Sequence, residues 1–469
     1  MRSYFGCHNH TMYSNLRLLD CINRPEDLIN KARELGLSGI AITDHECISA
    51  HVIANKIAKQ FKKEGIDFVI ALGNEIYLVE SRESGQKYYH FILIAKDAIG
   101  HKMIRELSST AWFNSYSDRG MERVPTLKSE VKEVVEKYGK GHLIATTACI
   151  GGELSSNALS MMNARKLGDQ QTASYHYNKI ISFVEFCLDL FGDDFYIECA
   201  PANSSDQKIV NNTLYKIAKA FNIKMAVGTD AHYLTAEDRP VHKAYLNSKG
   251  GEREVDDFYE FAHLMTYEEA AQLLLPSFLD CDRNPGEIVE EILDNTLEIQ
   301  NKIEFFDLFH KQDIPRVEVK NYPKNGGGWY VEDWEPNQYP HLRNMFNSED
   351  EQDRYWVNQC VEKLVELDKY NDTYLTELEE EARVKSVISE KLETNMFRYP
   401  NTLQHYIDMI WESGSMVGAG RGSSCAALNH YLMGITQLDP IEWNLPFFRY
   451  LNDERVELGS LILILPSCK

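Results

Sequence analysis

Short apolar runs of strand length recur over residues 1 to about 240, and each is followed by a stretch with helical periodicity. One such stretch, Arg24–Gly36, has a proline at its second position and ends in glycine, as helix termini prefer. Strands that alternate with helices predict an α/β fold of the βα-barrel type, in which functional side chains gather where strands end. The seven predicted strands are Tyr4–His8, Gly39–Asp44, Phe68–Leu78, Tyr88–Ala95, His142–Ala148, Phe195–Ala200 and Met225–Asp230.

After residue 240 the pattern loosens into aromatic and charged pieces, with a Gly/Pro-rich stretch at 321–329 that is typical of a loop. We therefore expect a barrel, a connecting region, a third unit and an apolar tail. Their expected bounds are 1–245, 246–345, 346–458 and 459–469.

The third unit begins with a helical pattern over residues 350–395. Within it, the charged run Glu377–Arg383 is predicted to be a solvated helix face. Further on, a strand is predicted at Ser415–Gly418 and a helix at Cys425–Met433, with a glycine-rich break between them.

Composition narrows the class of protein. The 469-residue chain is 43% hydrophobic and 26% charged, as ordinary globular proteins are. It has no run of about 18 apolar residues and no signal-peptide core, so we expect a cytoplasmic protein with no membrane partner. The net charge of -22 argues against coating of nucleic acid by bulk charge but allows a local basic channel. The ten cysteines form no CxxC pair and are expected to be reduced.

Residue types that bind metals gather at the predicted strand ends. His8 and His10 are two residues apart on a predicted strand, so both side chains point to one face, as binding of a single ion requires. Asp230 and His232 repeat this spacing at the last predicted strand. The other candidates at strand ends and nearby loops are Asp20, His45, Glu75, His90 and Cys149.

A single His or buried Cys is usually structural, and we keep that interpretation for His51 and His142. The joint pattern is harder to explain in this way, because each polar group would be costly near a barrel mouth. Imidazole, carboxylate and thiolate ligands suit a Zn²⁺ or Mn²⁺ cluster, in which a carboxylate such as Glu75 can bridge two ions. The chemistry that such a cluster favours is hydrolysis of a phosphoester.

The glycine-rich segment Ala419–Ser424 is a second candidate site. Its backbone N–H groups, two hydroxyls and Arg421 are directed to one point, which suits a phosphate group. It is neither a Walker A motif nor a Rossmann fingerprint, and alone it is also compatible with an ordinary turn.

The metal-type residues fall in short motifs, namely His8-Asn-His10, Thr43-Asp-His45, Gly73-Asn-Glu75, His90, Cys149 and Asp230-Ala-His232. These motifs resemble those of the PHP (polymerase and histidinol phosphatase) domain, a distorted seven-stranded βα barrel with a multinuclear metal centre. The resemblance implies that Asp44 is a neighbour of the site. It implies the following metal ligands: His8, His10, Asp20, His45, Glu75, His90, Cys149, Asp230 and His232.

Segments around the glycine-rich loop, Val417–Ser424, Tyr431–Pro440 and Asn444–Leu458, carry a second resemblance. They are similar to the palm of family C replicative DNA polymerases, the alpha subunits of bacterial DNA polymerase III, in which a PHP domain precedes the palm. This implies a mixed α+β partial palm, primer–template DNA and dNTP as partners, and Mg²⁺ for polymerisation only if the palm is completed. The implied nucleotide-binding residues are Gly420, Arg421, Gly422, Ser423 and Ser424.

The sequence departs from that family after Leu458. The family carries aspartates there that hold catalytic Mg²⁺, whereas Gly459–Lys469 contains no carboxylate side chain. We therefore do not expect this chain to polymerise DNA alone. A frameshift within Ser460–Ile464 would explain the apolar tail, and a split gene whose second chain completes the palm is the alternative.

Three functions follow from these observations. The first is the N-terminal portion of a bacterial or phage DNA polymerase III alpha subunit, whose PHP domain is a metal-dependent 3′–5′ exonuclease in proofreading. The second is a free-standing PHP phosphatase for small phosphomonoesters, against which the palm-like segments count. The third is a PHP scaffold without catalysis.

Overall fold

The computed structural model comprises two compact units, residues 1–309 and 310–469, which we describe separately. Within the part of the chain that the structure describes, no helix is both long and apolar enough to span a membrane. The described residues are 2–16, 19–83, 85–118, 121–249, 259–310, 314–324, 334–335 and 337–454.

A path of seven paired strands organises the first unit. Each strand of the path coincides with one of the predicted apolar runs, so the predicted α/β barrel is confirmed. The strands follow one another as β1 (Phe5–Gly6), β2 (Gly39–Ile42), β3 (Val69–Val79), β4 (Tyr89–Ala95), β8 (Leu143–Thr146), β9 (Phe195–Cys199) and β10 (Met225–Val227).

Among the described residues, three short strands lie off this path, and the sequence pattern does not predict them. β7 (Pro125–Leu127) pairs in parallel with β3. β5 (Tyr116–Asp118) and β6 (Met121–Arg123) form a separate two-stranded sheet. Each has only three residues and lacks the apolar run by which the other strands are recognised.

Two features distort the barrel. β4 runs antiparallel to both β3 and β8, whereas the other neighbours on the path are parallel. The segments after β1 and β10 meet in a single parallel bridge between Asn9 and Ala231. There the His10 N–H donates to the Ala231 carbonyl at 3.0 Å. The barrel is therefore nearly closed, and its closure lies among the predicted metal ligands.

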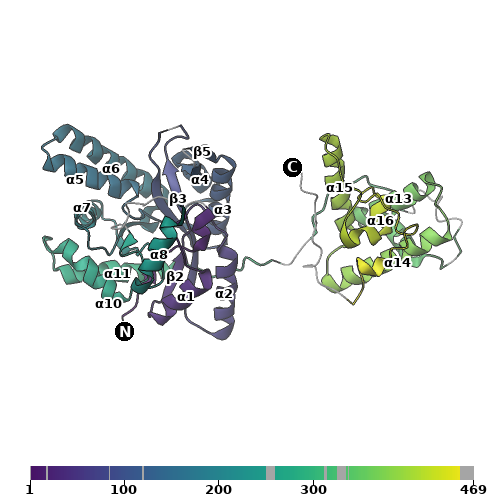
Figure 1. The fold of residues 1–469 in the computed structure, drawn as a ribbon, viewed down its shortest axis with the longest axis horizontal. Helices are drawn as coiled ribbons and strands as arrows, with labels where there is room; N and C mark the ends of the chain where they lie inside the picture. The colour runs from purple at the N-terminus through teal and green to yellow at the C-terminus, as the bar shows by residue number, and fades with distance from the viewer. Residues whose placement is uncertain are drawn as a thin grey trace. The chain divides into compact units, whose positions relative to one another are not determined.

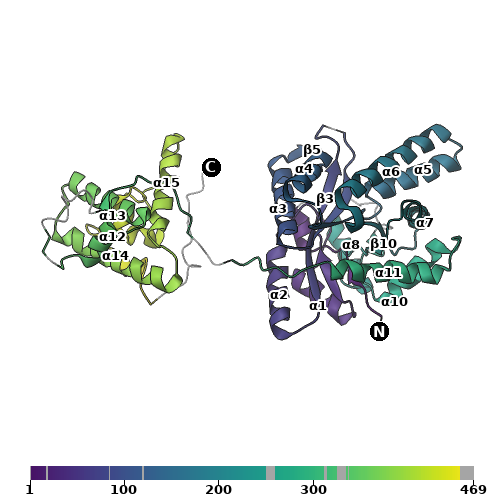
Figure 2. The same cartoon turned by 180° about the vertical axis from the view of Figure 1, so that it is seen from behind.

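Helices surround the barrel. Their bounds are α1 (Pro25–Glu34), α2 (His51–Glu64), α3 (Ala98–Phe113), α4 (Lys128–Tyr138), α5 (Glu153–Lys166), α6 (Gln170–Phe191), α7 (Ser205–Phe221), α8 (Arg239–Leu246), α10 (Tyr267–Leu274) and α11 (Pro285–Asn301). Figure 1 and Figure 2 show α1 to α4 on one flank of the sheet and α5, α6, α7, α10 and α11 on the other. The predicted helix over 24–36 is confirmed as α1, which starts at Pro25.

The strands have two different faces because their side chains alternate. One set, which includes Ala71, Ile92 and Ala226, forms a small apolar cluster shared by all the strands of the barrel. The alternate set packs with the helices in the main core of the unit. Glu75 and His90 continue the period of the first set along β3 and β4. The small cluster therefore forms an apolar floor beneath them.

The described part of the second unit is helical, with α12 (Pro340–Asn347), α13 (Glu351–Glu366), α14 (Asp372–Leu392), α15 (Arg398–Glu412) and α16 (Leu428–Leu432). The helices predicted over 350–395 are confirmed as α13 and α14. The strand predicted at Ser415–Gly418 is wrong, because these residues pair with no strand. The helix predicted from Cys425 is preceded by a 3-10 turn, Gly422–Ala426. The tail 459–469 lies outside the described residues.

The charged run Glu377–Arg383 lies in α14, and the prediction of a solvated face is wrong at Glu381. This residue is fully buried, and its carboxylate accepts hydrogen bonds from the Leu428 and Asn429 N–H groups at the start of α16. No side chain of α16 or of its N-cap residue caps that helix. Glu381 therefore supplies a cap from another helix, which a local sequence pattern does not reveal.

Candidate metal centre

The bridge that closes the barrel has predicted ligands on both of its strands. His8 and His10 flank the first residue of the bridge, and their Nε2 atoms lie 3.0 Å apart. Asp230 and His232 flank the second residue of the bridge. The Asp230 Oδ1 atom lies 3.2 Å from His8 Nε2 and 3.1 Å from His10 Nε2. Closure of the barrel thus brings four side chains of ligand type together.

Glu75 lies at the centre of the cluster. Its carboxylate is 2.5 Å from His45 Nδ1 and 2.9 Å from His90 Nδ1. It is also 3.5 Å from His8 Nε2 and 3.4 Å from His10 Nε2. Burial opposes ionisation, but the surrounding imidazoles, His90 first, hold the pKa of Glu75 well below its usual range. A carboxylate among four imidazoles is well placed to bridge two ions.

Asp20 reaches the cluster from the loop after β1. Its Oδ2 atom lies 3.2 Å from His45 Nε2 and 3.6 Å from His232 Nε2. Burial opposes its ionisation too, but His45 and His232 lower the pKa of Asp20 below its usual range. The Asp20 N–H donates to Asn15 Oδ1 at 3.0 Å, which fixes the loop there.

Cys149 lies beside His90, with its Sγ atom 3.6 Å from His90 Nδ1. Burial raises the pKa of the Cys149 thiol well above its ordinary value, and the charges of Asp230 and Glu75 add to this rise. A thiolate ligand at this position therefore requires a bound cation to compensate its charge.

Several buried ligand atoms have no hydrogen-bond partner outside the cluster among the described residues, namely both Glu75 oxygens, Asp20 Oδ1, Asp230 Oδ1, His45 Nδ1 and His232 Nε2. Buried polar atoms without partners are rare and costly. Three sets have donor atoms within 4.8 Å of one another: His10, His45 and His232; His8, His10 and Asp230; His45, Glu75 and His90. The residues present fit a cluster of divalent ions, and these nitrogen and oxygen donors suit Zn²⁺ or Mn²⁺.

Glu198 supports this cluster, although the sequence analysis does not single it out. Its Oε1 atom accepts a hydrogen bond from His8 Nδ1 at 2.7 Å, which leaves His8 Nε2 for a metal. The Thr146 hydroxyl donates to its Oε2 atom at 2.8 Å. Gly228 makes room for it, because a Cβ there would lie 2.2 Å from Glu198 Oε1. The sequence signal by which Glu198 could have been found is the presence of a glutamate within the apolar strand Phe195–Cys199.

His10 has a similar support. Its Nδ1 atom donates to Ser14 Oγ at 3.0 Å, and the Ser14 hydroxyl donates to Asp44 Oδ1 at 2.8 Å. Asp44 also accepts from the Thr11 N–H and hydroxyl. Burial raises the pKa of Asp44 to about 6, although these hydrogen bonds oppose the rise. Asp44 is thus a neighbour of the cluster that orients His10 through Ser14.

His51 and His142 form other contacts. His51 Nε2 donates to the Gly73 carbonyl at 2.8 Å, and its Nδ1 atom lies 3.1 Å from His101 Nε2. His142 Nδ1 lies 2.6 Å from Asp97 Oδ2. Both histidines therefore have structural partners, in agreement with the interpretation from the sequence.

The predicted nucleotide-binding residues, Gly420 to Ser424, lie in one turn of the second unit, and all but Ser424 are exposed. Gly420 and Gly422 have φ angles of +129° and +69°, values that favour glycine. The Ser424 hydroxyl donates to the Arg421 carbonyl at 3.1 Å. The buried His430 donates from Nδ1 to the Ser424 carbonyl at 3.1 Å, so the turn is held from the interior of the unit.

Two family models match the chain. The PHP domain matches residues 6–202, and the bacterial DNA polymerase III alpha NTPase domain matches residues 353–460. The PHP match covers most of the barrel and the ligand-type residues from His8 to Cys149, whereas β10, Asp230 and His232 lie beyond it.

Relatives extend this result to nearly the whole chain. "Probable DNA polymerase YorL" of Bacillus subtilis and the "DNA-directed DNA polymerase" of Bacillus phage SPbeta are each 38% identical to it over 97% of this chain and 36% of their own length. The DNA polymerase III subunit alpha of Borreliella burgdorferi is 27% identical over 97% of this chain and 34% of its own length.

The protein is homologous to DNA polymerase III alpha subunits over 97% of its length and corresponds to the N-terminal portion of this polymerase family. The resemblance predicted from the motifs is confirmed. The chain spans about a third of the length of the curated relatives it matches.

Proposed function

We propose that the first unit is a metal-dependent 3′–5′ exonuclease that removes nucleotides from the 3′ end of a primer. The observation that supports this most directly is the convergence of imidazoles and carboxylates whose buried atoms have no other partners. The relatives named as DNA polymerases favour DNA over a small phosphomonoester as the substrate.

The side chains of the first unit would hold the metal ions and keep one another in the orientation that binding requires. When bound, divalent ions polarise a phosphodiester and lower the pKa of water. Glu198 fixes the His8 ring through Nδ1, and Ser14 fixes the His10 ring in the same way, so both Nε2 atoms face the cluster. His232 Nδ1 donates to the Asp230 carbonyl at 2.7 Å, which turns its Nε2 atom inward too. The site is thus arranged before any substrate arrives.

Release of a 3′-terminal label from a primer–template, in Mn²⁺ or Zn²⁺, tests the proposal. We expect release by the full chain and none by the His8→Ala/His10→Ala variant. Faster turnover of a small phosphomonoester than of the oligonucleotide would instead indicate the phosphatase. Stoichiometric metal without hydrolysis of either would indicate a scaffold.

A second proposal concerns the exposed turn of the second unit, which we propose to bind the triphosphate of a dNTP. Its support is the pair of glycines with positive φ that flank the exposed Arg421, a backbone arrangement that can bind anions. DNA synthesis by the whole polymerase would then use primer–template DNA, dNTP and Mg²⁺, with palm carboxylates supplied by a second chain or segment. Binding of dATP to the full chain, weakened by Arg421→Gln, tests this. Equal binding by both proteins would contradict it.

The proposed location is the bacterial cytoplasm, since the relatives come from bacteria and from a Bacillus phage.

A further inference from the structure

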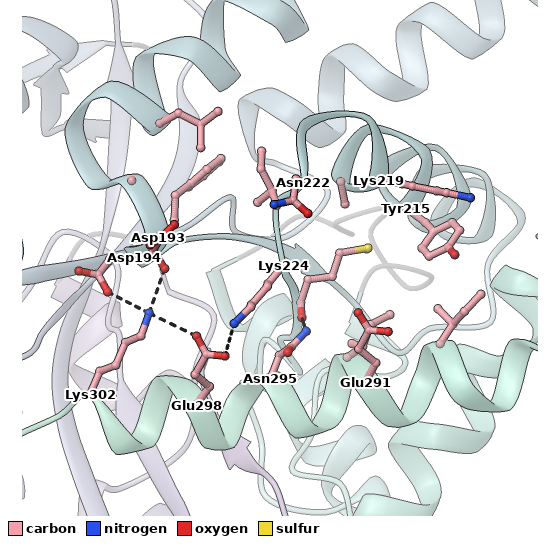
Figure 3. Close-up of a pocket in the computed structure, with 18 of the residues that line it drawn as sticks. Asp193, Asp194, Tyr215, Lys219, Asn222, Lys224, Glu291, Asn295, Glu298 and Lys302 are labelled. Atoms are coloured by element: carbon pink, nitrogen blue, oxygen red, sulfur yellow. Dashed lines mark hydrogen bonds and ion pairs between the residues drawn. The ribbon is translucent and has the colours of Figure 1, made fainter. Parts of the chain in front are cut away.

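Two cavities of the first unit lie at opposite ends of β9 and β10. The larger, of about 780 Å³, is lined by residues at the start of both strands and by α7 and α11 (Figure 3). Its basic side chains are already neutralised. Lys302 lies 3.0 Å from Asp194, Lys224 pairs with Glu298, and the other two have carboxylate partners as well. This cavity therefore presents no basic group that lacks a partner.

The smaller cavity has a volume of about 290 Å³ and lies where β9 and β10 end. Cys149 and Asp230 line it, so it shares a wall with the candidate metal centre. Its volume is at the lower end of the range for small-molecule sites, about 300–1,000 Å³. A single compact group fits this volume.

Polar groups of the wall are available to such an occupant. Thr229 lines the cavity and is 5% exposed, and its hydroxyl oxygen has no hydrogen-bond partner among the described residues. The first turn of α7 also lines the cavity, from the N-cap Ser204 to Gln207. A buried hydroxyl without a partner is costly, so a hydrogen bond from an occupant would be favourable.

The charged side chains that line the smaller cavity indicate which kind of ligand it can bind. No Lys, Arg or His lines the cavity, whereas two carboxylates, Asp206 and Asp230, do. The wall therefore offers a phosphate group no basic side chain. Ile150 and the half-buried Phe261 add apolar and aromatic surface. An uncharged group with a flat ring and hydrogen-bonding edges matches this wall.

We propose that this cavity binds the nucleoside of the 3′-terminal nucleotide while the phosphodiester that links it to the primer lies at the metal centre. The inference rests on the proposed exonuclease function and adds a specificity site to it. Phe261 would stack on the base, and Thr229 would hydrogen-bond to the base or the sugar.

Equilibrium dialysis of labelled deoxyadenosine, which carries no phosphate, against the full Zn²⁺-loaded chain tests the inference. We expect Phe261→Leu to weaken binding about tenfold, because it keeps apolar volume but removes the stacking face. Thr229→Val, which removes only the hydroxyl, should weaken it about fivefold. Tyr215→Phe, in the larger cavity, serves as the matched control and should leave binding unchanged.

Several outcomes would overturn the inference: no binding of deoxyadenosine, equal binding by all four proteins, or displacement of deoxyadenosine by inorganic phosphate. Failure of the proposed function is distinguishable from these outcomes. If the label of a primer is not released but deoxyadenosine binds with the expected pattern, the nuclease proposal fails and the nucleoside site stands. If the label is released and neither variant changes deoxyadenosine binding, only the nucleoside site fails.

Discussion

The metal centre of the first unit and the glycine-rich turn of the second unit differ in where their functional atoms lie. In the barrel, the carboxylate oxygens of Glu75 are buried and face imidazoles of four histidines. In the turn, Gly420 and Arg421 are exposed, the buried His430 holds the Ser424 carbonyl, and the buried Glu381 caps α16, the helix that follows. One site holds its polar atoms inside the protein, and the other presents them to solvent.

This difference teaches how ligand binding relates to stability. Buried carboxylates that have no hydrogen-bond partner outside the cluster make the folded barrel costly until a cation compensates them. The exposed turn is hydrated when empty, so its ligand changes little in the fold. Metal loading should therefore stabilise the first unit strongly, whereas the second unit depends on its internal supports. Four predictions test this contrast, from the largest effect to the smallest.

Removal of metal should have the largest effect. Each ion held at a thousandfold excess over its Kd contributes about 4 kcal/mol to the free energy of unfolding. Differential scanning calorimetry with Zn²⁺ and with a chelator should show that only the transition of the first unit shifts. The His8→Ala/His10→Ala variant should lose this shift. Equal shifts of both transitions would contradict the contrast.

Glu381→Ala should destabilise the second unit by about 3–5 kcal/mol. The substitution removes the cap of α16. It also leaves the buried Lys385 ammonium, which lies 3.9 Å from the Glu381 carboxylate in the structure, without its counter-charge. Glu380→Ala, one residue earlier, is the control, because Glu380 is exposed and should cost no more than about 1 kcal/mol. Urea unfolding measures both, and equal losses would show that the burial of Glu381 has no role.

Gly228→Ala should lower metal affinity about 10- to 100-fold. The added Cβ would lie 2.2 Å from Glu198 Oε1 and displace that carboxylate from His8 Nδ1. Gly418→Ala is the matched control, since a Cβ there would meet no atom within 4 Å. Competition with a chromogenic chelator gives both affinities. An unchanged affinity in Gly228→Ala would mean that Glu198 does not orient His8.

The smallest predicted effect is the loss of stability of the second unit at acidic pH. Burial, with a contribution from Lys385, lowers the pKa of His430 to about 3. The unfolded chain takes up a proton near pH 6.5 that the folded chain does not, so stability falls as pH drops below 6.5. From pH 7.5 to 5.5 this single group removes about 1.4 kcal/mol. His430→Gln should reduce the pH dependence of urea unfolding of the second unit by that amount, and an unaltered slope would contradict this.

The strands of the barrel are well predicted from the sequence because each depends on a strong local pattern of apolar residues. The run Phe68–Leu78 is apolar on both sides of Gly73-Asn-Glu75 and appears as β3. His8 and His10 are found through their spacing, and the predicted barrel brings the strand end with Glu75 beside them, where the structure has it. The residue types of these side chains already indicate metal binding, so the residues that the sequence motifs single out are also the ones that lie in contact.

Residues whose role depends on a distant partner are not predicted. Glu381 has the local pattern of a solvated glutamate, and only its contact with α16 shows that it is buried. Glu198 is hidden for a similar reason, because His8 is its partner from another strand. The strand expected at Ser415–Gly418 fails because a short apolar run is weak evidence for a strand when no partner strand is known.

The bridge between Asn9 and Ala231 also sets an order of events on the ribosome. At about 5–20 residues per second, His8 and His10 are translated on the order of ten to forty seconds before Asp230 and His232. During that interval the nascent chain carries two histidines of the candidate metal centre but not Asp230, whose carboxylate lies within 3.2 Å of both. Any ion captured then is held by an incomplete shell. The full candidate centre can be assembled only after Asp230 and His232 have been synthesised, so complete loading of metal is expected to follow synthesis of all seven strands of the path.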